Sequence, residues 1–298
     1  MYPNILILFE GLKEKTKMYS DILAHRLVLK HSDNPDDQLL QAAYKLILNS
    51  TYGLLNNKYS KLNCPKLAFS ITVYGQVALY TLASRLANIG ARVININTDG
   101  VAYVYEGNLD KQIIEEWEKE FSLSMEVEYF DRWIQKDVNN YIAIYDKEKP
   151  LEKGNVVLVG GDVNKYLKPK IFANNDIRIV QKALVDNLVY DKPVQDTIME
   201  NIDDPSLFQY TLNITGKFNA VVDQDGNKHQ KVNRIFAGKN TGFNLSKQRA
   251  DGTLVKFPNS PTDMLLWNGD ISDISNFRDV IDKNWYYELT LHKLKAWR

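Results

Sequence analysis

Lys45, Asn49 and Tyr52 form the row of side chains whose types and spacing best suit a chemical role. They lie at i, i+4 and i+7, so a helix would point a cation, an amide and a phenol at one target. Gly53 follows on the same face, where the missing side chain lets a ligand approach the backbone. An ammonium and an amide suit the oxygens of a triphosphate. A solvated helix face with an ordinary lysine explains the same spacing, so the row alone leaves both interpretations open.

Asp99 is the second candidate. Residues 93–105 alternate and are rich in β-branched and aromatic side chains, which predicts a β-hairpin with its turn at Thr98-Asp99-Gly100. A carboxylate that projects from such a turn could hold Mg²⁺ for phosphoryl transfer, in which divalent ions clamp the attacking and leaving oxygens. Asp-Gly is also common turn chemistry, and a single hairpin aspartate is more often structural than catalytic.

Periodicity predicts the elements that must position these residues. Residues 10–30 form a charged helix, residues 31–37 break it, and a second helix carries the row, giving an antiparallel helical hairpin. Arg26 and Lys30 share a face of the first helix at i and i+4. The second helix is expected to pack through the face opposite the row, which holds Leu40, Ala43, Tyr44, Ile47, Thr51 and Leu54.

The rest of the chain alternates between helical and strand-like patterns. The apolar residues 5–8 fit either a buried strand or the start of a helix. Helices are predicted at 65–89, 109–123, 177–188, after Pro193 and at 285–297, with strands at 125–131 and 138–146 and β-like residues at 232–256. A boundary is expected near residue 165, after a glycine-rich stretch.

Composition excludes several classes of protein. The 298 residues are 44% hydrophobic, enough for a packed core of one large or two ordinary domains. The single cysteine, Cys64, rules out an internal disulfide and fits a reducing compartment. No run approaches about 18 apolar residues, so no membrane partner is expected. Lys+Arg and Asp+Glu are both 37, so any nucleic-acid contact must come from local basic clusters.

Three segments, in order, resemble motifs of family B DNA polymerases. Residues 45–53 match the fingers motif Lys-x-x-x-Asn-Ser-x-Tyr-Gly at every fixed position. Residues 1–5 resemble the tail of the first palm motif, Asp-x-x-Ser-Leu-Tyr-Pro-x-Ile, and residues 97–100 resemble the second, usually Asp-Thr-Asp-Ser. The resemblance covers residues 1–105 sharply and the rest loosely. It looks closest to polymerases of bacterial viruses, which implies a viral or prophage origin and the cytoplasm of a bacterial host.

The resemblance implies template-directed DNA synthesis by deoxynucleotidyl transfer to a primer 3′ end, with two Mg²⁺ ions. Asp99 matches the principal metal ligand of the second palm motif. Asn97 stands where the family has another acid, and its amide can bind metal or orient water but adds no negative charge.

The same resemblance assigns nucleotide binding to the helical hairpin and to the start of the chain. It implies that a deoxynucleoside triphosphate is bound by Arg26, Lys30, Lys45, Asn49 and Tyr52. Tyr2 would lie under the sugar, where a ring leaves no room for a 2′-hydroxyl. A surface tyrosine at a frayed terminus is the alternative for Tyr2.

Contacts with primer-template DNA are expected in the second half. Asn139-Asn140-Tyr141 stands where the family has Lys-x-Tyr, so Asn139 and Tyr141 are candidate DNA contacts without the charge of the lysine. Lys165, Lys168 and Lys170 form a candidate backbone-binding patch, although a solvated loop fits them equally.

The implied fold is α+β in the polymerase right-hand architecture. We expect helical-hairpin fingers at 9–56, an antiparallel-sheet palm at 1–8 and 57–164, and a mixed, mainly helical thumb at 165–298. In the family, an aspartate opens the first palm motif upstream of the position that Met1 occupies, and an exonuclease domain precedes the palm. We therefore expect the chain to need an N-terminal polymerase or exonuclease segment or subunit, and not to polymerise DNA alone. The alternative function is a catalytically incomplete nucleotide- or DNA-binding fragment, or a subunit of a split polymerase.

Overall fold

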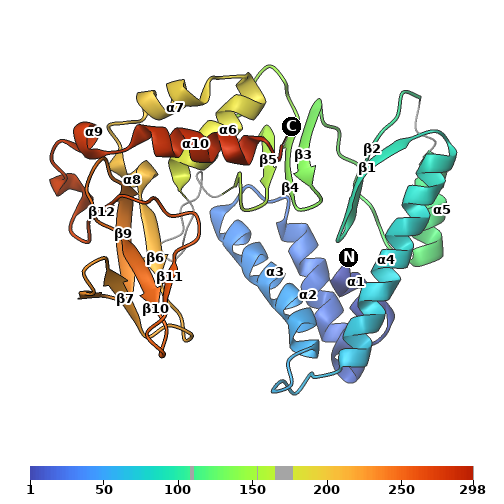
Figure 1. Cartoon of the computed structure of the whole chain (residues 1–298). Coiled ribbons are helices and arrows are strands. Elements are labelled where there is room, and N and C mark those ends of the chain that lie inside the picture. The colour runs from blue at the N-terminus through green and yellow to red at the C-terminus, as the bar shows by residue number, and fades with distance from the viewer. Residues whose placement is uncertain (108–110, 153, 165–176, 298) are drawn as a thin grey trace. The chain divides into compact units, whose positions relative to one another are not determined.

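The computed structural model describes residues 1–107, 111–152, 154–164 and 177–297. It divides into two compact units, Met1–Glu128 and Tyr129–Arg298, which are described separately (Figure 1). The sequence suggested a boundary near residue 165, which lies outside the described residues. The division into palm, fingers and thumb stays a prediction.

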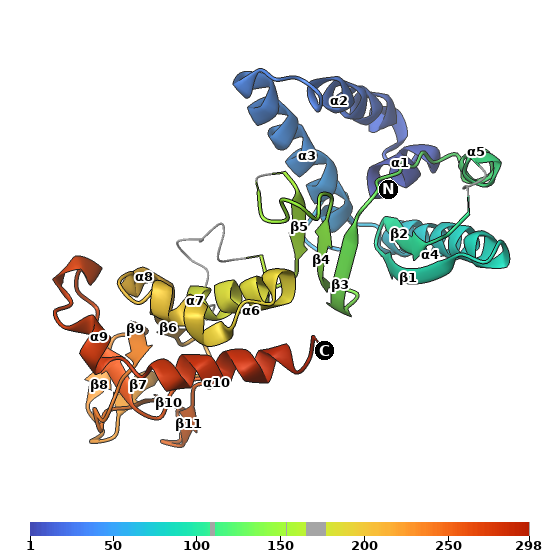
Figure 2. The same cartoon turned by 90° about the horizontal axis from the view of Figure 1, so that it is seen from above.

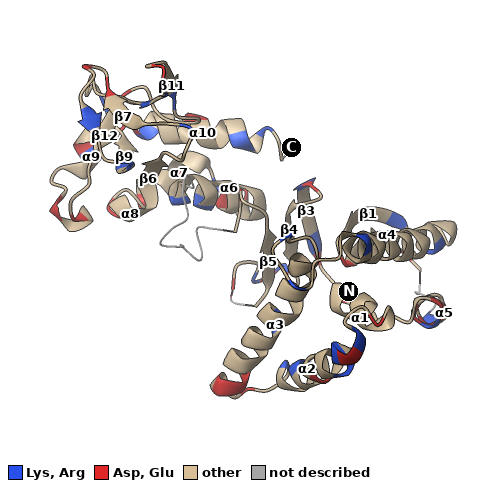
Figure 3. Ribbon diagram, turned by 90° about the horizontal axis from the view of Figure 1, so that it is seen from below, with Lys and Arg blue, Asp and Glu red and all other residues tan. Residues whose placement is uncertain are grey.

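A helical hairpin begins the first unit, as the sequence predicted (Figures 1 and 2). This part of the unit contains α1 (Tyr2–Leu8), the 3₁₀ helix η1 (Lys13–Lys15), α2 (Thr16–Leu29) and α3 (Pro35–Leu55). The hairpin is formed by α2 and α3. The Asn34 side chain caps α3 by accepting a 3.0 Å hydrogen bond from the Asp36 N–H. Pro35 takes the first helical position, where no N–H donor is needed. The acidic first turn, red in Figure 3, lies at the end of the helix where the dipole favours negative charge.

A long helix, a β-hairpin and a shorter helix complete the first unit. They are α4 (Pro65–Asn88), β1 (Arg92–Asn97), β2 (Gly100–Val104) and α5 (Lys111–Phe121), all at predicted positions. The fully buried Trp117 of α5 donates from Nε1 to the Ala78 carbonyl of α4 at 2.6 Å. In the described part of the chain, α4 alone has the length and hydropathy of a membrane-spanning helix, but a core helix meets the same criteria.

The start of the chain is a helix, so of the two structures that fitted the apolar residues 5–8 the buried strand is wrong. Pro3 lies in the first turn of α1, a position that its fixed φ favours. Ile5 and Leu6, at most 1% exposed, pack in the core of the first unit. Because these two residues are adjacent in sequence, the apolar run carried no period that could separate helix from strand.

The packing face expected for α3 is wrong in part. The buried residues of the helix are Leu48, Thr51 and Leu55. Leu48 lies only about 60° around the helix from Lys45, so the buried face is beside the row and not opposite it. Apolar residues of the expected face are exposed, namely Leu40, Ala43, Ile47 and Leu54.

An antiparallel sheet begins the second unit. Its strands are β3 (Arg132–Asp137), β4 (Asn140–Ile144) and β5 (Val156–Val159), paired in that order. The strand expected at 125–131 is wrong, because pairing with β4 starts only at Arg132, opposite Ile144. The Arg132 guanidinium also donates to the carbonyls of Leu188 and Val189, both at 3.0 Å, which ties β3 to the end of the following helix.

Helices and two further antiparallel sheets build the rest of the second unit. The helices are α6 (Arg178–Tyr190), α7 (Val194–Glu200), α8 (Pro205–Phe208), η2 (Ile271–Asp273), α9 (Phe277–Val280) and α10 (Lys283–Leu294). The strands are β6 (Tyr210–Asn213), β7 (Ala220–Asp223), β8 (Lys228–His229), β9 (Val232–Ala237), β10 (Leu245–Gln248), β11 (Leu254–Lys256) and β12 (Met264–Leu266). Their orders are β12-β9-β6 and β11-β10-β7-β8. The fully buried Tyr286 joins these parts, donating to the Phe208 carbonyl at 2.8 Å and accepting from the Ala237 N–H at 2.9 Å.

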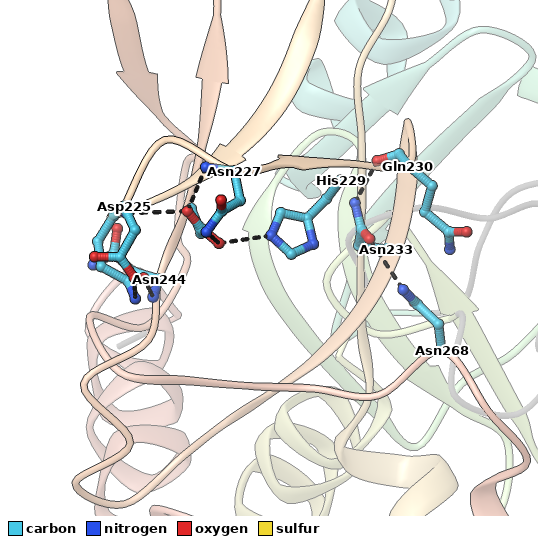
Figure 4. A network of polar contacts seen from close by, with 9 residues as sticks. Asp225, Asn227, His229, Gln230, Asn233, Asn244 and Asn268 are labelled. Carbon is cyan, nitrogen blue, oxygen red and sulfur yellow. Dashed lines mark hydrogen bonds and ion pairs between the residues drawn. The ribbon is translucent and has the colours of Figure 1, made fainter.

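A polar network closes the β7–β8 hairpin (Figure 4). The Asp223 carboxylate accepts hydrogen bonds from the backbone N–H groups of Asp225 and Asn227 and from the Asn227 amide, at 2.8–3.1 Å. The same carboxylate lies 3.0 Å from His229 Nε2. The His229 contact first, and then the Asn227 and Asp225 donors, lower the pKa of Asp223 to about 2.

Candidate active site

The predicted triphosphate row lies on the middle of α3. Lys45 and Asn49 are exposed, and Tyr52 is half-buried. Tyr19 of α2 connects the two helices, because its hydroxyl donates a hydrogen bond to the Leu48 carbonyl of α3 at 2.7 Å. Burial raises the pKa of Tyr19 to about 12, so its hydroxyl stays a donor at neutral pH. The row is therefore carried by a helix whose rotation is fixed by α2.

Lys30, at the end of α2, has a partner that the sequence did not indicate. Its Nζ donates to both carboxylate oxygens of Glu126 at 2.9 Å. Lys30 lowers the pKa of Glu126, with smaller contributions from His31 and Arg26. Arg26 lies one turn earlier, with a buried Nε that has no hydrogen-bond partner among the described residues. Lys30 thus pairs with an acid 96 residues further along the chain, and Arg26 lies near enough to that acid to help lower its pKa.

Tyr2 and Tyr52 are brought together as a stacked pair. Their ring centroids are 4.4 Å apart and the ring planes differ by 12°. The Tyr52 hydroxyl lies 2.7 Å from Thr72 Oγ1 on α4. Burial first, and then the nearby Tyr52 and Asp99, raise the pKa of Tyr2. Residues from α1, α3, α4 and the β1–β2 hairpin therefore converge here.

The hairpin turn places Asn97 and Asp99 differently from the expectation. Asn97 ends β1 opposite Gly100, and Asp99 lies in the two-residue turn, after Thr98 with φ at +41°. Their two-residue spacing would put both side chains on one face of a continuous strand, but Asp99 lies in the turn, so the alternation along a strand does not apply to it. Asn97 Oδ1 accepts a 2.8 Å hydrogen bond from Thr98 Oγ1, and the Asp99 N–H donates to the Asn97 carbonyl.

A pocket of about 370 Å³ joins Tyr2 to the hairpin. Its lining residues are Tyr2, Thr72, Gly75, Gln76, Leu79, Tyr80, Ile96, Asn97 and Thr98. A Cβ at Gly75 would lie 3.0 Å from Met1 Sδ, so a side chain there would disturb the chain start. Two predicted site residues, Tyr2 and Asn97, share this pocket, whereas the contributions of α4 were not predicted. An alignment of related sequences is the signal that could have revealed them.

Oxygen ligands at the hairpin suit Mg²⁺ in kind. Asp99 offers a carboxylate and Asn97 an amide oxygen, both hard ligands. Among the described residues, no group of three or more His, Cys, Asp or Glu side chains is placed to hold a metal ion. Mg²⁺ usually takes only one or two protein carboxylates and completes its shell with phosphates and water. The donor set therefore fits a Mg²⁺ ion that a bound triphosphate helps to hold.

In the second unit, Asn139 and Tyr141 lie at the tip of the β3–β4 hairpin. Asp137 shapes the tip by accepting from the Asn139 N–H at 2.9 Å and from the Asn140 amide at 3.0 Å. Tyr141 stacks on Trp133, with ring centroids 4.4 Å apart and planes differing by 15°. Trp133 was not singled out from the sequence. The predicted lysine patch, Lys165, Lys168 and Lys170, lies outside the described residues.

Comparisons with known proteins support the resemblance over part of the chain. Residues 17–127 match the model of DNA polymerase family B. The DNA polymerase 1 of Saccharolobus solfataricus is 25% identical over 202 residues, 62% of this chain and 22% of that protein. The DNA polymerase 1 of Sulfolobus acidocaldarius is 26% identical over 161 residues, 51% of this chain and 18% of that protein. The chain thus spans about a fifth of the length of these relatives.

A solved structure extends the likeness to the fold. The family B DNA polymerase from the hyperthermophilic archaeon Pyrobaculum calidifontis superposes with a TM-score of 0.50 at 14% identity, over 95% of this chain and 37% of that chain. These relatives are archaeal, so the likeness to polymerases of bacterial viruses stays a prediction. On these matches, residues 17–127 form part of a domain related to the family B DNA polymerases.

Proposed function

We propose that this chain carries the nucleotide-binding and metal-binding parts of a template-directed DNA polymerase, which transfers deoxynucleotides to a primer 3′ end. The observation that carries the proposal is the convergence at Tyr2. The ring of Tyr2 stacks on Tyr52, which belongs to the triphosphate row, and lines one pocket with Asn97 of the hairpin. Segments that the family resemblance assigns to sugar, triphosphate and metal are thus neighbours in one compact unit.

In this proposal the triphosphate is bound from α2 and α3. Lys45 supplies a compact charge and Asn49 an amide one turn further along the exposed face. Arg26 and Lys30 add charge from the end of α2. Lys30 must then release Glu126, whose pair with it is only partly shielded from water, with side-chain exposures of 35% and 70%.

Asp99 holds Mg²⁺ in this proposal, and Asn97 helps to hold it or a bound water. When bound, the two ions of such an enzyme neutralise charge on the transferring phosphate and on the oxygens it moves between. Tyr2 excludes a 2′-hydroxyl by the volume of its ring. Asn139 and Tyr141 contact the primer-template duplex, together with the lysines at 165, 168 and 170.

Mg²⁺-dependent extension of a primed template tests the proposal. The assay uses the chain both alone and joined to a segment that supplies the first palm motif with its aspartate. We expect Asp99→Asn to abolish the extension that either form supports, while Asp131→Asn, which removes a carboxylate of the second unit, leaves it intact. Extension that survives Asp99→Asn, in protein free of host polymerases, would refute the assignment of the metal ligand.

A nucleotide- and DNA-binding module without catalysis is the second candidate function. The observation that favours it is Asn97, which leaves the hairpin with one carboxylate where the family has two. This candidate predicts that the joined protein binds deoxynucleotides and primed DNA but incorporates nothing at any Mg²⁺ or Mn²⁺ concentration. Asn97→Asp should then create activity, because it restores the second acid of the motif.

A further inference from the structure

Thr72 of α4 touches both the pocket and the stacked tyrosine pair. Its Oγ1 lies 2.7 Å from the Tyr52 hydroxyl, and the residue lines the pocket with Tyr2. The sequence motifs gave Thr72 no role, and nothing in its polarity sets it apart from Ser70, two residues earlier on the same helix.

Counting protons settles the direction of the Tyr52–Thr72 hydrogen bond. Thr72 Oγ1 donates to the Ala68 carbonyl at 3.0 Å, and a threonine hydroxyl has only one proton. The short contact with Tyr52 must therefore use a lone pair of Thr72 as acceptor and the Tyr52 phenol as donor. The carbonyl of Ala68 thereby orients the threonine hydroxyl, which in turn fixes the far end of the Tyr52 ring.

The fixed Tyr52 ring supports Tyr2 from one side. The two rings lie face to face at 4.4 Å, so Tyr2 cannot tilt toward α3 without losing the stacking contact. Tyr2 also lines the pocket, together with Asn97. Any loosening of Tyr52 therefore gives the Tyr2 ring freedom to shift in the wall of the pocket.

We propose that Thr72 is a positioning residue for sugar selection: by anchoring Tyr52, it holds the Tyr2 ring where a 2′-hydroxyl would otherwise fit. The inference rests on the proposed function, since it needs Tyr2 to lie under the sugar of a bound nucleotide. It adds a residue of α4 that belongs neither to the triphosphate row nor to the metal-binding turn. Loss of this anchor should raise the affinity for a ribonucleotide more than that for a deoxynucleotide, because only the ribonucleotide needs the space that Tyr2 vacates.

The test measures the ratio of dissociation constants for ATP and dATP, on the full chain with Mg²⁺ and primed template. Thr72→Val keeps the shape of the side chain but removes the acceptor. We expect it to lower discrimination against ATP about three- to tenfold, the effect of losing one hydrogen bond. Tyr52→Phe removes the donor and should give the same change, and the double variant should add nothing to either single variant.

Two matched variants separate positioning from a general loss of structure. Thr72→Ser keeps the acceptor and should restore the parental ratio. Ser70→Ala removes the same kind of hydrogen bond, from Ser70 Oγ to the Lys66 carbonyl at 3.0 Å, without touching a tyrosine, and should leave the ratio unchanged. An equal effect of Ser70→Ala would show that α4 responds to any lost hydroxyl, which would overturn the inference.

Tyr2→Ala distinguishes failure of the inference from failure of the proposed function. If Tyr2→Ala relaxes the ratio and Thr72→Val does not, the inference is wrong and the proposed function stands. If Tyr2→Ala also leaves the ratio at the parental value, Tyr2 does not select the sugar, and both the assignment of Tyr2 and the role of Thr72 fall.

Discussion

Lys45→Ala should weaken the binding of a deoxynucleoside triphosphate about 10- to 150-fold, since a hydrogen bond to a charged group contributes about 1.5–3 kcal/mol. Lys45 is exposed on α3 and belongs to none of the ion pairs among the described residues. Its ammonium therefore exchanges only water for phosphate oxygen when the nucleotide binds. The full contribution of the new contact should appear in the affinity.

Lys30→Ala should cost less than Lys45→Ala. Lys30 already donates to both oxygens of Glu126 at 2.9 Å, so it must give up one anion to bind another. An exposed pair of this kind contributes about 0.2–1 kcal/mol, which reduces the expected loss by up to about fivefold relative to Lys45. The structure thus ranks two lysines that the sequence motif treats alike.

Isothermal titration of dATP into the parent and variant chains, at low and moderate NaCl, measures both effects. Lys66→Ala is the matched control, because Lys66 is an exposed lysine of α4 in the same unit. The losses of affinity from Lys45→Ala and Lys30→Ala should both shrink as salt is added. A larger loss from Lys30→Ala than from Lys45→Ala, or an equal loss from Lys66→Ala, would refute the reasoning.

The remaining predictions concern the metal, stability and pH. In the joined enzyme, Asp99→Asn should abolish primer extension and Asn97→Ala should reduce it less; the opposite ranking would identify Asn97 as the main ligand. Tyr286→Phe should lower the free energy of urea unfolding by about 2–5 kcal/mol, because two buried backbone groups lose their partner; a loss under 0.5 kcal/mol would contradict that structure. The pKa of Asp223 is lowered to about 2 in the folded chain, so its stabilising effect is present above its ordinary value near 4 and is lost as the pH falls toward 2. The free energies of unfolding of the parent and the Asp223→Asn chain should therefore converge as the pH falls over that range. At pH 5, the effect of Asp223→Asn on the free energy of unfolding should be smaller in a chain that also carries His229→Gln.

Local patterns predicted the elements of the first unit well. The long apolar stripe of α4, its proline start and the Asp-Gly turn of the β-hairpin each act within a few residues, so the sequence alone reveals them. The packing face of α3 was predicted less well. An apolar side chain such as Ile47, 47% exposed, has the same local signature as Leu48, 1% exposed. Which face is buried depends on partners far along the chain, such as Tyr19, 29 residues away, which lies in the same core as Leu48 and donates to its carbonyl.

Residues of the candidate site could be identified from the sequence where a motif contains them. They could not be identified where only a contact in the structure marks them. Lys45, Tyr52 and Asp99 stand at fixed motif positions. No motif names Glu126, which lay in an expected strand, or Thr72, which lay in an expected helix. Their importance depends on partners 96 and 20 residues away. The error in the strand expected at 125–131 has the same cause, a partner that lies elsewhere in the sequence. The β-branched and aromatic residues of this segment favour a strand, yet β4 ends opposite Arg132 and offers no partner before it.

Aromatic donors connect the helices of the first unit in series. Tyr19 of α2 donates to the backbone of α3, Tyr52 of α3 donates to Thr72 of α4, and Tyr74 of α4 donates to the Phe121 carbonyl of α5 at 2.8 Å. Each of these rings also packs against apolar neighbours in the core of the unit. The triphosphate row on α3 is therefore fixed to α4, the helix that packs against the β1–β2 hairpin and its Asp99 turn.

Because of these linked contacts, the distance between the triphosphate row and the Asp99 turn depends on the packing of the rings as well as on the backbone. A substitution that removes only a hydroxyl, such as Tyr52→Phe, keeps the buried area and should leave the helices together. It frees the orientation of one ring while the apolar contacts persist. In the proposed function, sugar selection depends on where the Tyr2 ring lies, so it should respond to such substitutions before stability does. The triphosphate affinity proposed for the flexible Lys45 side chain should hardly respond at all.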